Sequence, residues 1–237
     1  MGSDITMPKM DRSDRRAHRF AGMSKEGRRG ARRQVFLEAG IDVIADVGLA
    51  NTKVRAICDR AGLTERYFYE SFATLQQFAL QVVHTVAAQL SMTLLGEALQ
   101  VSDGHARLRA VTKKLVSAID ADRRVGRILF VEAARAGGEL ARLRHQMLYN
   151  AAWLMSRWLI DQQSTSDLAA LAAPLWAQLL GVVPMESEVD DINTIAIAGA
   201  CAEILDAWLD ERIELSAEDL GEYLLRYIDQ TVAWQQG

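Results

Sequence analysis

The sequence predicts an all-α fold, and three observations support this prediction. The prolines are Pro8, Pro174 and Pro184, so residues 9–173 contain none. A run of this length disfavours a loop-rich β-sandwich or barrel. The helix formers Ala, Leu, Arg, Glu and Gln outnumber the β-branched residues, and no long stretch alternates with period two. With 50% hydrophobic and 24% charged residues, the chain has enough apolar side chains for a sizeable core.

The first predicted helix runs from about Lys25 to Val47, where apolar residues recur at three- and four-residue spacing. Gly48 stands where a glycine would end this helix. We expect Thr52 to be the N-cap of a second helix. The sequence Gly62-Leu63-Thr64 then indicates a glycine stop and a new N-cap, followed by a very short third helix over residues 64–69.

The rest of the chain continues as helices. Thr74-Leu75-Gln76-Gln77 is a capping box for a helix that extends to about Leu95. Ser216-Ala217-Glu218-Asp219 is a start signal for the last helix. The periodicity predicts further helices near 105–120, 122–136, 138–163, 167–180, 189–211 and 216–235. We therefore divide the chain into an arm expected to be disordered (1–23), a three-helix domain (24–73) and a larger helical domain (74–237).

The charges are unevenly distributed along the chain. Residues 1–72 carry 14 basic and 10 acidic residues, a net charge of +4, whereas residues 73–237 carry 13 and 21, a net charge of −8. The densest basic run is Arg28-Arg29-Gly30-Ala31-Arg32-Arg33. This asymmetry is typical of a nucleic-acid reader with a separate regulatory body. The alternative is a solvated, disordered basic tail that contacts nothing.

Several function classes find no support in the sequence. The histidines have no His or Cys at i+3 or i+4, and there is no CxxC, GxGxxG, GxxxxGK[ST] or GxSxG motif. We therefore expect no catalytic residues, no metal site and no cofactor. Cys58 and Cys201 are expected to be small apolar residues in a reducing compartment. The apolar segment from Leu168 to Met185 contains Pro174 and Pro184, so a buried helix with a turn is preferred over a membrane span. The expected location is the cytoplasm.

The segment from Thr52 to Tyr69 has the pattern of a helix-turn-helix, with two short helices joined by a turn that begins at glycine. Its apolar residues are spaced to hold the two helices against each other and against the first helix. Its polar residues from Thr64 onward remain available to enter a major groove. Any small helical bundle contains such a turn, so the pattern alone leaves both interpretations open.

A set of short segments lies between Arg33 and Phe78: Val35-Phe36-Leu37-Glu38-Ala39, Val47-Gly48-Leu49, Thr52, Ile57-Cys58-Asp59-Arg60-Ala61-Gly62-Leu63-Thr64 and Tyr67-Phe68-Tyr69-Glu70-Ser71-Phe72. Together they resemble the N-terminal DNA-binding domain of TetR-type transcriptional regulators. One position departs from the family pattern, because Leu75 stands where such proteins usually carry a Lys at the start of helix four. That substitution removes one expected phosphate contact.

The resemblance implies roles for individual residues. Thr52, Thr64 and Tyr69 would bind phosphates, and Arg66 and Tyr67 would reach base edges. Lys53 and Arg55 would add phosphate contacts, and the full predicted DNA-binding set is Thr52, Lys53, Arg55, Thr64, Glu65, Arg66, Tyr67 and Tyr69. Phe68 and Phe72 are expected in the core. The basic arm would reach the DNA backbone or a minor groove.

The resemblance also implies a regulatory mechanism in which a ligand changes the spacing of two DNA-binding heads in a dimer and lowers operator affinity. The predicted function is a regulator, expected to repress, that binds an inverted-repeat operator as a homodimer and is released by a small hydrophobic effector. The predicted pocket residues are Phe130, Met147, Asn150, Trp153, Leu154 and Trp158. The alternative for each of them is ordinary core packing. An alternative for the whole chain is an all-helical carrier or adaptor that does not bind DNA.

We expect the homodimer to form through the last two helices, because they carry more apolar residues than two terminal helices would bury in a monomer. These residues are Ile192, Ile195, Ile197, Leu205, Trp208, Leu220, Leu224 and Ile228.

Overall fold

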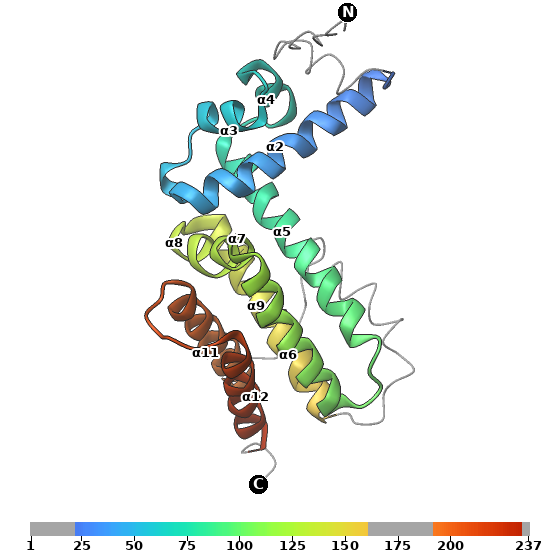
Figure 1. Cartoon of the computed structure of the whole chain (residues 1–237), viewed down its shortest axis with the longest axis vertical. Helices are drawn as coiled ribbons and strands as arrows, with labels where there is room; N and C mark the ends of the chain where they lie inside the picture. The colour runs from blue at the N-terminus through green and yellow to red at the C-terminus, as the bar shows by residue number, and fades with distance from the viewer. Residues whose placement is uncertain (1–21, 161–191, 234–237) are drawn as a thin grey trace, which may run out of the picture.

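The computed structural model describes residues 22–160 and 192–233. These residues form helices and connecting turns without any strand, so the all-α prediction is confirmed. The molecule is elongated, with a small helical head at one end and a longer helical body below it (Figure 1).

The head consists of α2 (Lys25–Val47), the 3-10 turn η1 (Leu49–Asn51), α3 (Val54–Ala61) and α4 (Glu65–Ser71). Helix α2 ends at Gly48, whose φ of 79° favours glycine. The turn between α3 and α4 depends on Gly62, which has a left-handed φ of 65°. The N–H of Leu63 donates to the carbonyl of Cys58 at 3.1 Å and closes the end of α3. The predicted helix-turn-helix is therefore present.

Four phenylalanines form the centre of the head. Phe36 of α2, Phe68 of α4, Phe72 after α4 and Phe78 of α5 are all buried. The Phe36 and Phe68 rings meet edge to face with 5.5 Å between their centroids, and the Phe72 and Phe78 rings do so at 4.8 Å. Such pairs contribute about 0.5–1.5 kcal/mol each beyond the area they bury. The cluster fixes α4 against both the first helix and the start of the body, as predicted for Phe68 and Phe72.

The body begins with α5, which leaves the head and runs down one side of the molecule (Figure 1). Its N-cap is Thr74, whose hydroxyl accepts from the N–H of Gln77 at 3.0 Å, and the Gln77 side chain accepts in turn from the N–H of Ala73. The predicted helix near 122–136 contains a π-helical segment, η2, in its middle. The body elements are α5 (Leu75–Ala98), α6 (Gly104–Ala121), α7 (Arg123–Gly126), η2 (Arg127–Glu132), α8 (Ala133–Arg135), α9 (Gly138–Ile160), α11 (Ile192–Leu209) and α12 (Ala217–Ala233).

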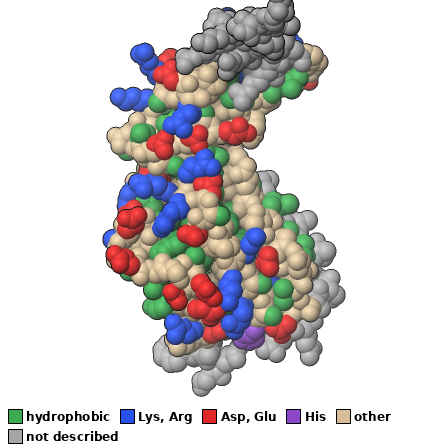
Figure 2. Space-filling view, in the orientation of Figure 1, with side chains coloured by type: hydrophobic (Ala, Val, Ile, Leu, Met, Phe, Trp, Pro, Cys, Tyr) green, Lys and Arg blue, Asp and Glu red, His purple; other side chains and the backbone are tan. Residues whose placement is uncertain are grey.

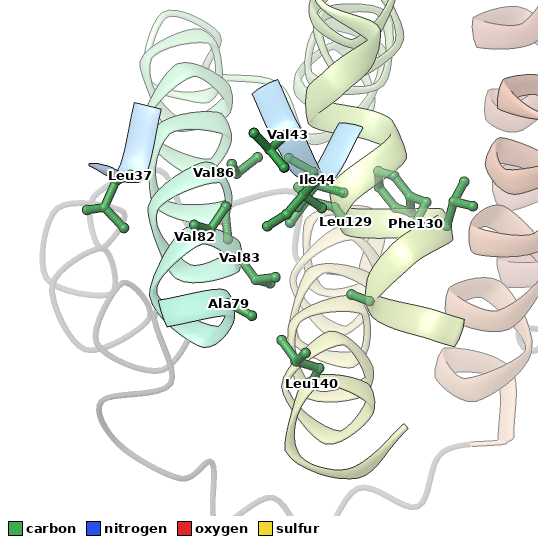
Figure 3. Close-up of a cluster of buried hydrophobic side chains, with 14 of the residues drawn as sticks. Leu37, Val43, Ile44, Ala79, Val82, Val83, Val86, Leu129, Phe130 and Leu140 are labelled. Atoms are coloured by element: carbon green, nitrogen blue, oxygen red, sulfur yellow. The ribbon is translucent and has the colours of Figure 1, made fainter. Parts of the chain in front are cut away.

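Head and body share one hydrophobic core. Figure 3 shows Val43 and Ile44 of α2 in the same buried cluster as Leu129 and Phe130 of η2 and Val82 and Val86 of α5. Packed interiors transmit displacement because they contain few voids. The head is therefore positioned by the body and is not tethered to it by a linker.

Some sequence predictions need correction or lie outside the described residues. Thr52 is not the N-cap of the second helix: that position is Lys53, and α3 begins at Val54. The reason is that the Thr52 hydroxyl donates to the carbonyl of Gly48 at 2.8 Å and closes η1 instead. The arm over residues 1–21, the predicted helix near 167–180 and the apolar segment Leu168–Met185 lie outside the described residues.

Within the described ranges, one helix, α5, is long and apolar enough to cross a membrane. Its most apolar window is 39% buried in the protein, and the helix packs against α2 and α6. Length and composition of this kind are weak evidence for a membrane span, because helices in protein cores share them.

Candidate nucleic-acid interface and internal cavity

The polar face of α3 and α4 forms an exposed surface on the head. The structure places seven predicted DNA-binding residues on it: Lys53, Arg55, Thr64, Glu65, Arg66, Tyr67 and Tyr69. Thr64 precedes α4 and its side chain makes no capping hydrogen bond. Exposed cations and hydrogen-bond donors thus lie on α3 and α4, while Phe68 holds the other face of α4 in the core.

Thr52, the eighth predicted residue, differs from the others. It is only 6% exposed. Its hydroxyl proton is used by the Gly48 carbonyl, and its N–H donates to the carbonyl of Leu49 at 3.2 Å. A phosphate accepts hydrogen bonds but donates none. Because both Thr52 donors are occupied, we do not include Thr52 in the proposed interface.

Arg66 is the most accessible cation on α4. Its side chain is 85% exposed, and its Nε lies 3.1 Å from the Glu70 carboxylate one turn along the helix. Exposed pairs at this spacing contribute only about 0.3–0.5 kcal/mol. A bidentate contact to guanine discriminates by about 1–3 kcal/mol. The pair with Glu70 therefore orients the guanidinium but is too weak to keep it from a base.

The densest basic run of the sequence lies on α2, where it holds α4 in place. Arg29 donates to the carbonyl of Glu70 at 2.8 Å, and Arg33 donates to the carbonyl of Ser71 at 2.7 Å. These carbonyls lie at the C-terminal end of α4, where helical partners are missing. The Arg32 guanidinium lies 4.4 Å from the centre of the Tyr67 ring. We call Arg29, Arg32 and Arg33 the arginine clasp; the sequence marked them only as part of its densest basic run.

An ion network joins the head to the body. Arg124 of α7 binds Asp42 of α2 and Asp122, and Arg60 of α3 binds Asp42 and Asp46. Hydrogen bonds from Arg124 hold the pKa of Asp122 below its usual value, and Asp122 and Asp42 in turn raise the pKa of Arg124. Figure 2 shows basic and acidic side chains intermixed at this level of the molecule.

A buried carboxylate makes a second connection between head and body. Glu132, the last residue of η2, is 7% exposed. Its Oε2 accepts a hydrogen bond of 2.8 Å from the N–H of Leu49. A Cβ placed on Gly48 would lie 3.0 Å from the same oxygen, so the glycine permits this approach. No signal in the sequence marked Glu132, because its partner is a backbone group 83 residues away.

The body contains an apolar cavity of about 160 Å³ between α5, α6, η2, α9 and α11. Phe130 and Met147, two of the predicted pocket residues, line it. Asn150 is buried, but it is not part of the lining and its Nδ2 has no hydrogen-bond partner among the described residues. The side chains of Trp153, Leu154 and Trp158 lie outside the described part of the chain. Lining residues that sequence reasoning missed include Leu90, Leu94, Arg144, Ile197 and Cys201.

Two lining residues have functional groups with perturbed acidity. Burial raises the pKa of the Cys201 thiol to about 12, so it remains protonated and acts as an apolar surface. Burial lowers the pKa of the Arg144 guanidinium. Neither cysteine is in a disulfide, and the described residues contain no cluster of His, Cys, Asp and Glu that would hold a metal ion.

The reason given above for a dimer at the last two helices is wrong. Ile197, Leu205, Trp208, Leu220, Leu224 and Ile228 are buried within the protomer. They pack mostly against α6, η2 and α9. The sequence argument considered the two terminal helices without these neighbours. The large apolar residues of α11 and α12 that remain exposed are Ile192, Ile195 and Tyr223.

A comparison with protein families finds that residues 36–82 match the model of the bacterial regulatory proteins of the tetR family. The head of this chain is a TetR-family DNA-binding domain. The match covers 47 of the 237 residues and assigns this part of the chain to a family of bacterial regulatory proteins. The matched range covers the second half of α2, then η1, α3 and α4, and the start of α5.

Comparisons with solved structures extend the likeness to the whole TetR-like fold. The chain is similar to the fatty acid degradation regulator FadR from Bacillus halodurans, with a TM-score of 0.62 and 15% identity over 82% of this chain and 96% of that one. It is also similar to FadR from Bacillus subtilis, solved in complex with stearoyl-CoA, with a TM-score of 0.62 and 16% identity over 82% and 96%. A TetR-like regulator from Rhodococcus sp. RHA1 matches with a TM-score of 0.58 and 16% identity over 90% and 97%. No curated protein sequence matches the chain.

Proposed function

We propose that this protein is a cytoplasmic TetR-family repressor that binds an inverted-repeat operator as a homodimer and is released by a small hydrophobic effector. One observation carries the proposal. Leu129 and Phe130 line the cavity, and Glu132, two residues further along the same π-helical segment, binds the N–H of Leu49 in the head. A ligand that moves the cavity wall therefore acts on the element that positions the DNA-binding domain.

The exposed face of α3 and α4 supports the DNA-binding half of the proposal. Arg66 is assigned to a base edge, while Lys53, Arg55, Thr64 and Tyr69 are assigned to phosphates, which position the protein without reading sequence. Lys53 and Arg55 are exposed and form no ion pair within the described residues. Tyr67 would reach a base edge with its ring supported by Arg32.

The cavity supports the effector half. Its lining is almost entirely aliphatic or aromatic, which suits an apolar ligand that displaces little ordered water. The structural neighbour FadR from Bacillus subtilis was solved in complex with stearoyl-CoA, a molecule with a long apolar chain. We infer an effector with an apolar portion in the present cavity.

A homodimer would place two copies of α4 in successive major grooves, about 34–36 Å apart. We assign the dimer contact to the exposed faces of α11 and α12, where Ile195 and Tyr223 are accessible. Gly199 lies on the same exposed side of α11, and a Cβ added there would meet no atom within 4 Å. A second helix would approach closely at such a position.

The test is fluorescence anisotropy on the DNA upstream of the protein's own gene, followed by selection from random duplexes. We expect salt-dependent binding and an enriched inverted repeat whose half-sites lie about one helical turn apart. Adding a hydrophobic ligand found by thermal-shift screening should release the DNA. A stable, folded dimer that shows no salt-dependent retention on any duplex would contradict the proposal.

A further inference from the structure

The apolar cavity of the body contains one charged side chain among its described lining residues, Arg144 of α9. Ser91 and Cys201 are the only other lining residues with a polar or thiol side chain, and burial keeps Cys201 protonated. The Nε of Arg144 is buried and has no hydrogen-bond partner within the described residues. A buried guanidinium donor without a partner is destabilising, so its retention at the cavity wall calls for an explanation.

The acidic groups near Arg144 are Glu203 and Asp206 of α11, which act on it electrostatically. Both carboxylates are hydrogen-bonded by another arginine: Arg212 donates to Glu203 at 3.2 Å and also binds Asp206. No hydrogen bond joins either of them to Arg144 in the structure. The Nε–H of Arg144 therefore remains available to a group in the cavity.

We propose that Arg144 binds the anionic head of an amphipathic effector whose apolar tail fills the cavity. A guanidinium presents parallel N–H donors that match the two oxygens of a carboxylate, and this match is strongest where water is excluded. The aliphatic walls supplied by Leu90, Leu94 and Ile197 suit the tail. The effector is thus an anion with a single apolar chain and not a neutral hydrocarbon.

The cavity volume limits the size of the tail. At about 160 Å³ it is comparable with an engineered cavity of about 150 Å³ that admits benzene. A tail of about six carbons, the carbon number of benzene, is consistent with this space. The anion can be the carboxylate of a free acid or the phosphate groups of an acyl thioester, and the experiment below separates these sources.

This inference rests on the proposed function only where it says that the bound effector releases DNA, because binding of the effector itself is measured without DNA. The test is isothermal titration calorimetry of the full chain with three probes of equal tail length: octanoate, 1-octanol and octanoyl-CoA. We expect the wild type to bind octanoate at least tenfold more tightly than 1-octanol. Equal affinity for these two probes, or no binding of any probe, would overturn the assignment.

Three variants locate the anion contact. Arg144→Met keeps much of the side-chain volume and should lose the preference for octanoate while retaining 1-octanol. Arg144→Lys keeps the charge but not the paired donors, so its preference should be intermediate. Arg142→Met, at an exposed position on the same helix, is the control and should behave as wild type. If Arg144→Met lowers only the melting temperature and keeps the preference, Arg144 is a structural counterion of Glu203 and Asp206 and the proposal is wrong.

The octanoyl-CoA probe and the DNA measurement separate the remaining possibilities. If Arg144→Met no longer binds octanoyl-CoA, the anionic groups of this thioester contact Arg144. If Arg144→Met still binds octanoyl-CoA but no longer binds octanoate, Arg144 is a site for the carboxylate of free acids. Operator release is then measured with the same probes. If octanoate binds through Arg144 but does not release DNA, the anion site is supported and the proposed release by an effector is contradicted.

Discussion

Glu132 and Leu49 lie 83 residues apart in the chain, yet the Glu132 carboxylate accepts a 2.8 Å hydrogen bond from the Leu49 N–H. The contact joins the cavity-bearing body to the turn that follows the first helix of the head. It is local to a buried junction that also contains Gly48, whose lack of a side chain permits the approach. Head and body are therefore connected by a specific polar contact as well as by shared core packing.

The first prediction concerns this contact. Glu132→Ala leaves the Leu49 N–H without a partner, which should lower the free energy of unfolding by about 1–3 kcal/mol. Operator affinity without effector should change only a few-fold, while the effector should release DNA less completely. Chemical denaturation and anisotropy measure the two effects. Asp120→Ala, at an exposed carboxylate of α6, is the control, and an unimpaired release by Glu132→Ala would exclude this route of coupling.

The second prediction separates two groups of basic residues in the head. Arg33→Met removes the donor to Ser71 and should lower operator affinity at every salt concentration, because α4 loses part of its support. Arg55→Met should leave stability unchanged and reduce the slope of log affinity against log salt by about 0.9, the value for one phosphate contact. Anisotropy titrations between 50 and 300 mM salt, on the order of the usual range, measure both. If Arg33→Met also reduced the slope of log affinity against log salt, Arg33 would be a phosphate contact in the DNA interface.

The fold was predictable because most of its signals are local. The glycine stops at Gly48 and Gly62, the cap at Thr74 and the aromatic residues around Phe68 each act within a few residues of the chain. These signals determine helix ends correctly. Thr52 was misassigned because two local roles compete for one hydroxyl, and its bond to Gly48 excludes the cap.

The site was less predictable because its contacts are distant in sequence. A run of arginines predicts a basic surface, but only the packed head shows that Arg29 and Arg33 face carbonyls about 40 residues away. The cavity is formed by five elements, so a stripe on α9 identified Met147 and missed the walls from α5 and α11. The terminal helices looked too apolar for a monomer because their partners in α6 and α9 were unknown.

The third prediction concerns acid sensitivity at the boundary of head and body. Arg124 holds the pKa of Asp122 below its usual value of 3.8. The ionised carboxylate therefore stabilises the folded state above that pH, and this contribution is lost as the pH falls through the lower pKa of the folded protein. Asp122→Asn keeps a side-chain oxygen for the N–H of Arg124 but removes the charge. At pH 7 it should destabilise by at most about 1 kcal/mol, since the pair is partly exposed.

Urea denaturation at pH 7 and at about pH 3 measures this difference. The difference in the free energy of unfolding between wild type and Asp122→Asn should be smaller at the lower pH. Asp120→Asn should show no such difference at either pH because its side chain has no ion pair within the described residues. A stability difference of equal size at both pH values would mean that ionisation of Asp122 does not account for the effect of the substitution.

The fourth prediction distinguishes the dimer surface from the protomer core. Ile195 is 45% exposed whereas Leu205 is 1% exposed, although both belong to α11. Ile195→Glu should give a folded monomer, because the charge faces the proposed partner. Leu205→Glu should give unfolded or insoluble protein, because a buried unpaired carboxylate is not tolerated. Sedimentation velocity and far-UV circular dichroism distinguish these states, and a folded Ile195→Glu dimer would move the interface elsewhere.

The last prediction concerns how the protein would read its operator. Arg66→Ala removes the exposed guanidinium of α4 and loses only the weak pair with Glu70, so stability should be unchanged. Affinity for the operator should fall by about 1–3 kcal/mol, and the preference at one base pair in each half-site should relax. Lys53→Met is the matched comparison, because a lost phosphate contact weakens binding to every sequence equally. Competition titrations against operators mutated at single base pairs separate the two patterns. If Arg66→Ala weakened all sequences equally, Arg66 would be a phosphate ligand, and the base contact would have to come from another exposed residue of the same helix, with Tyr67 the first to test.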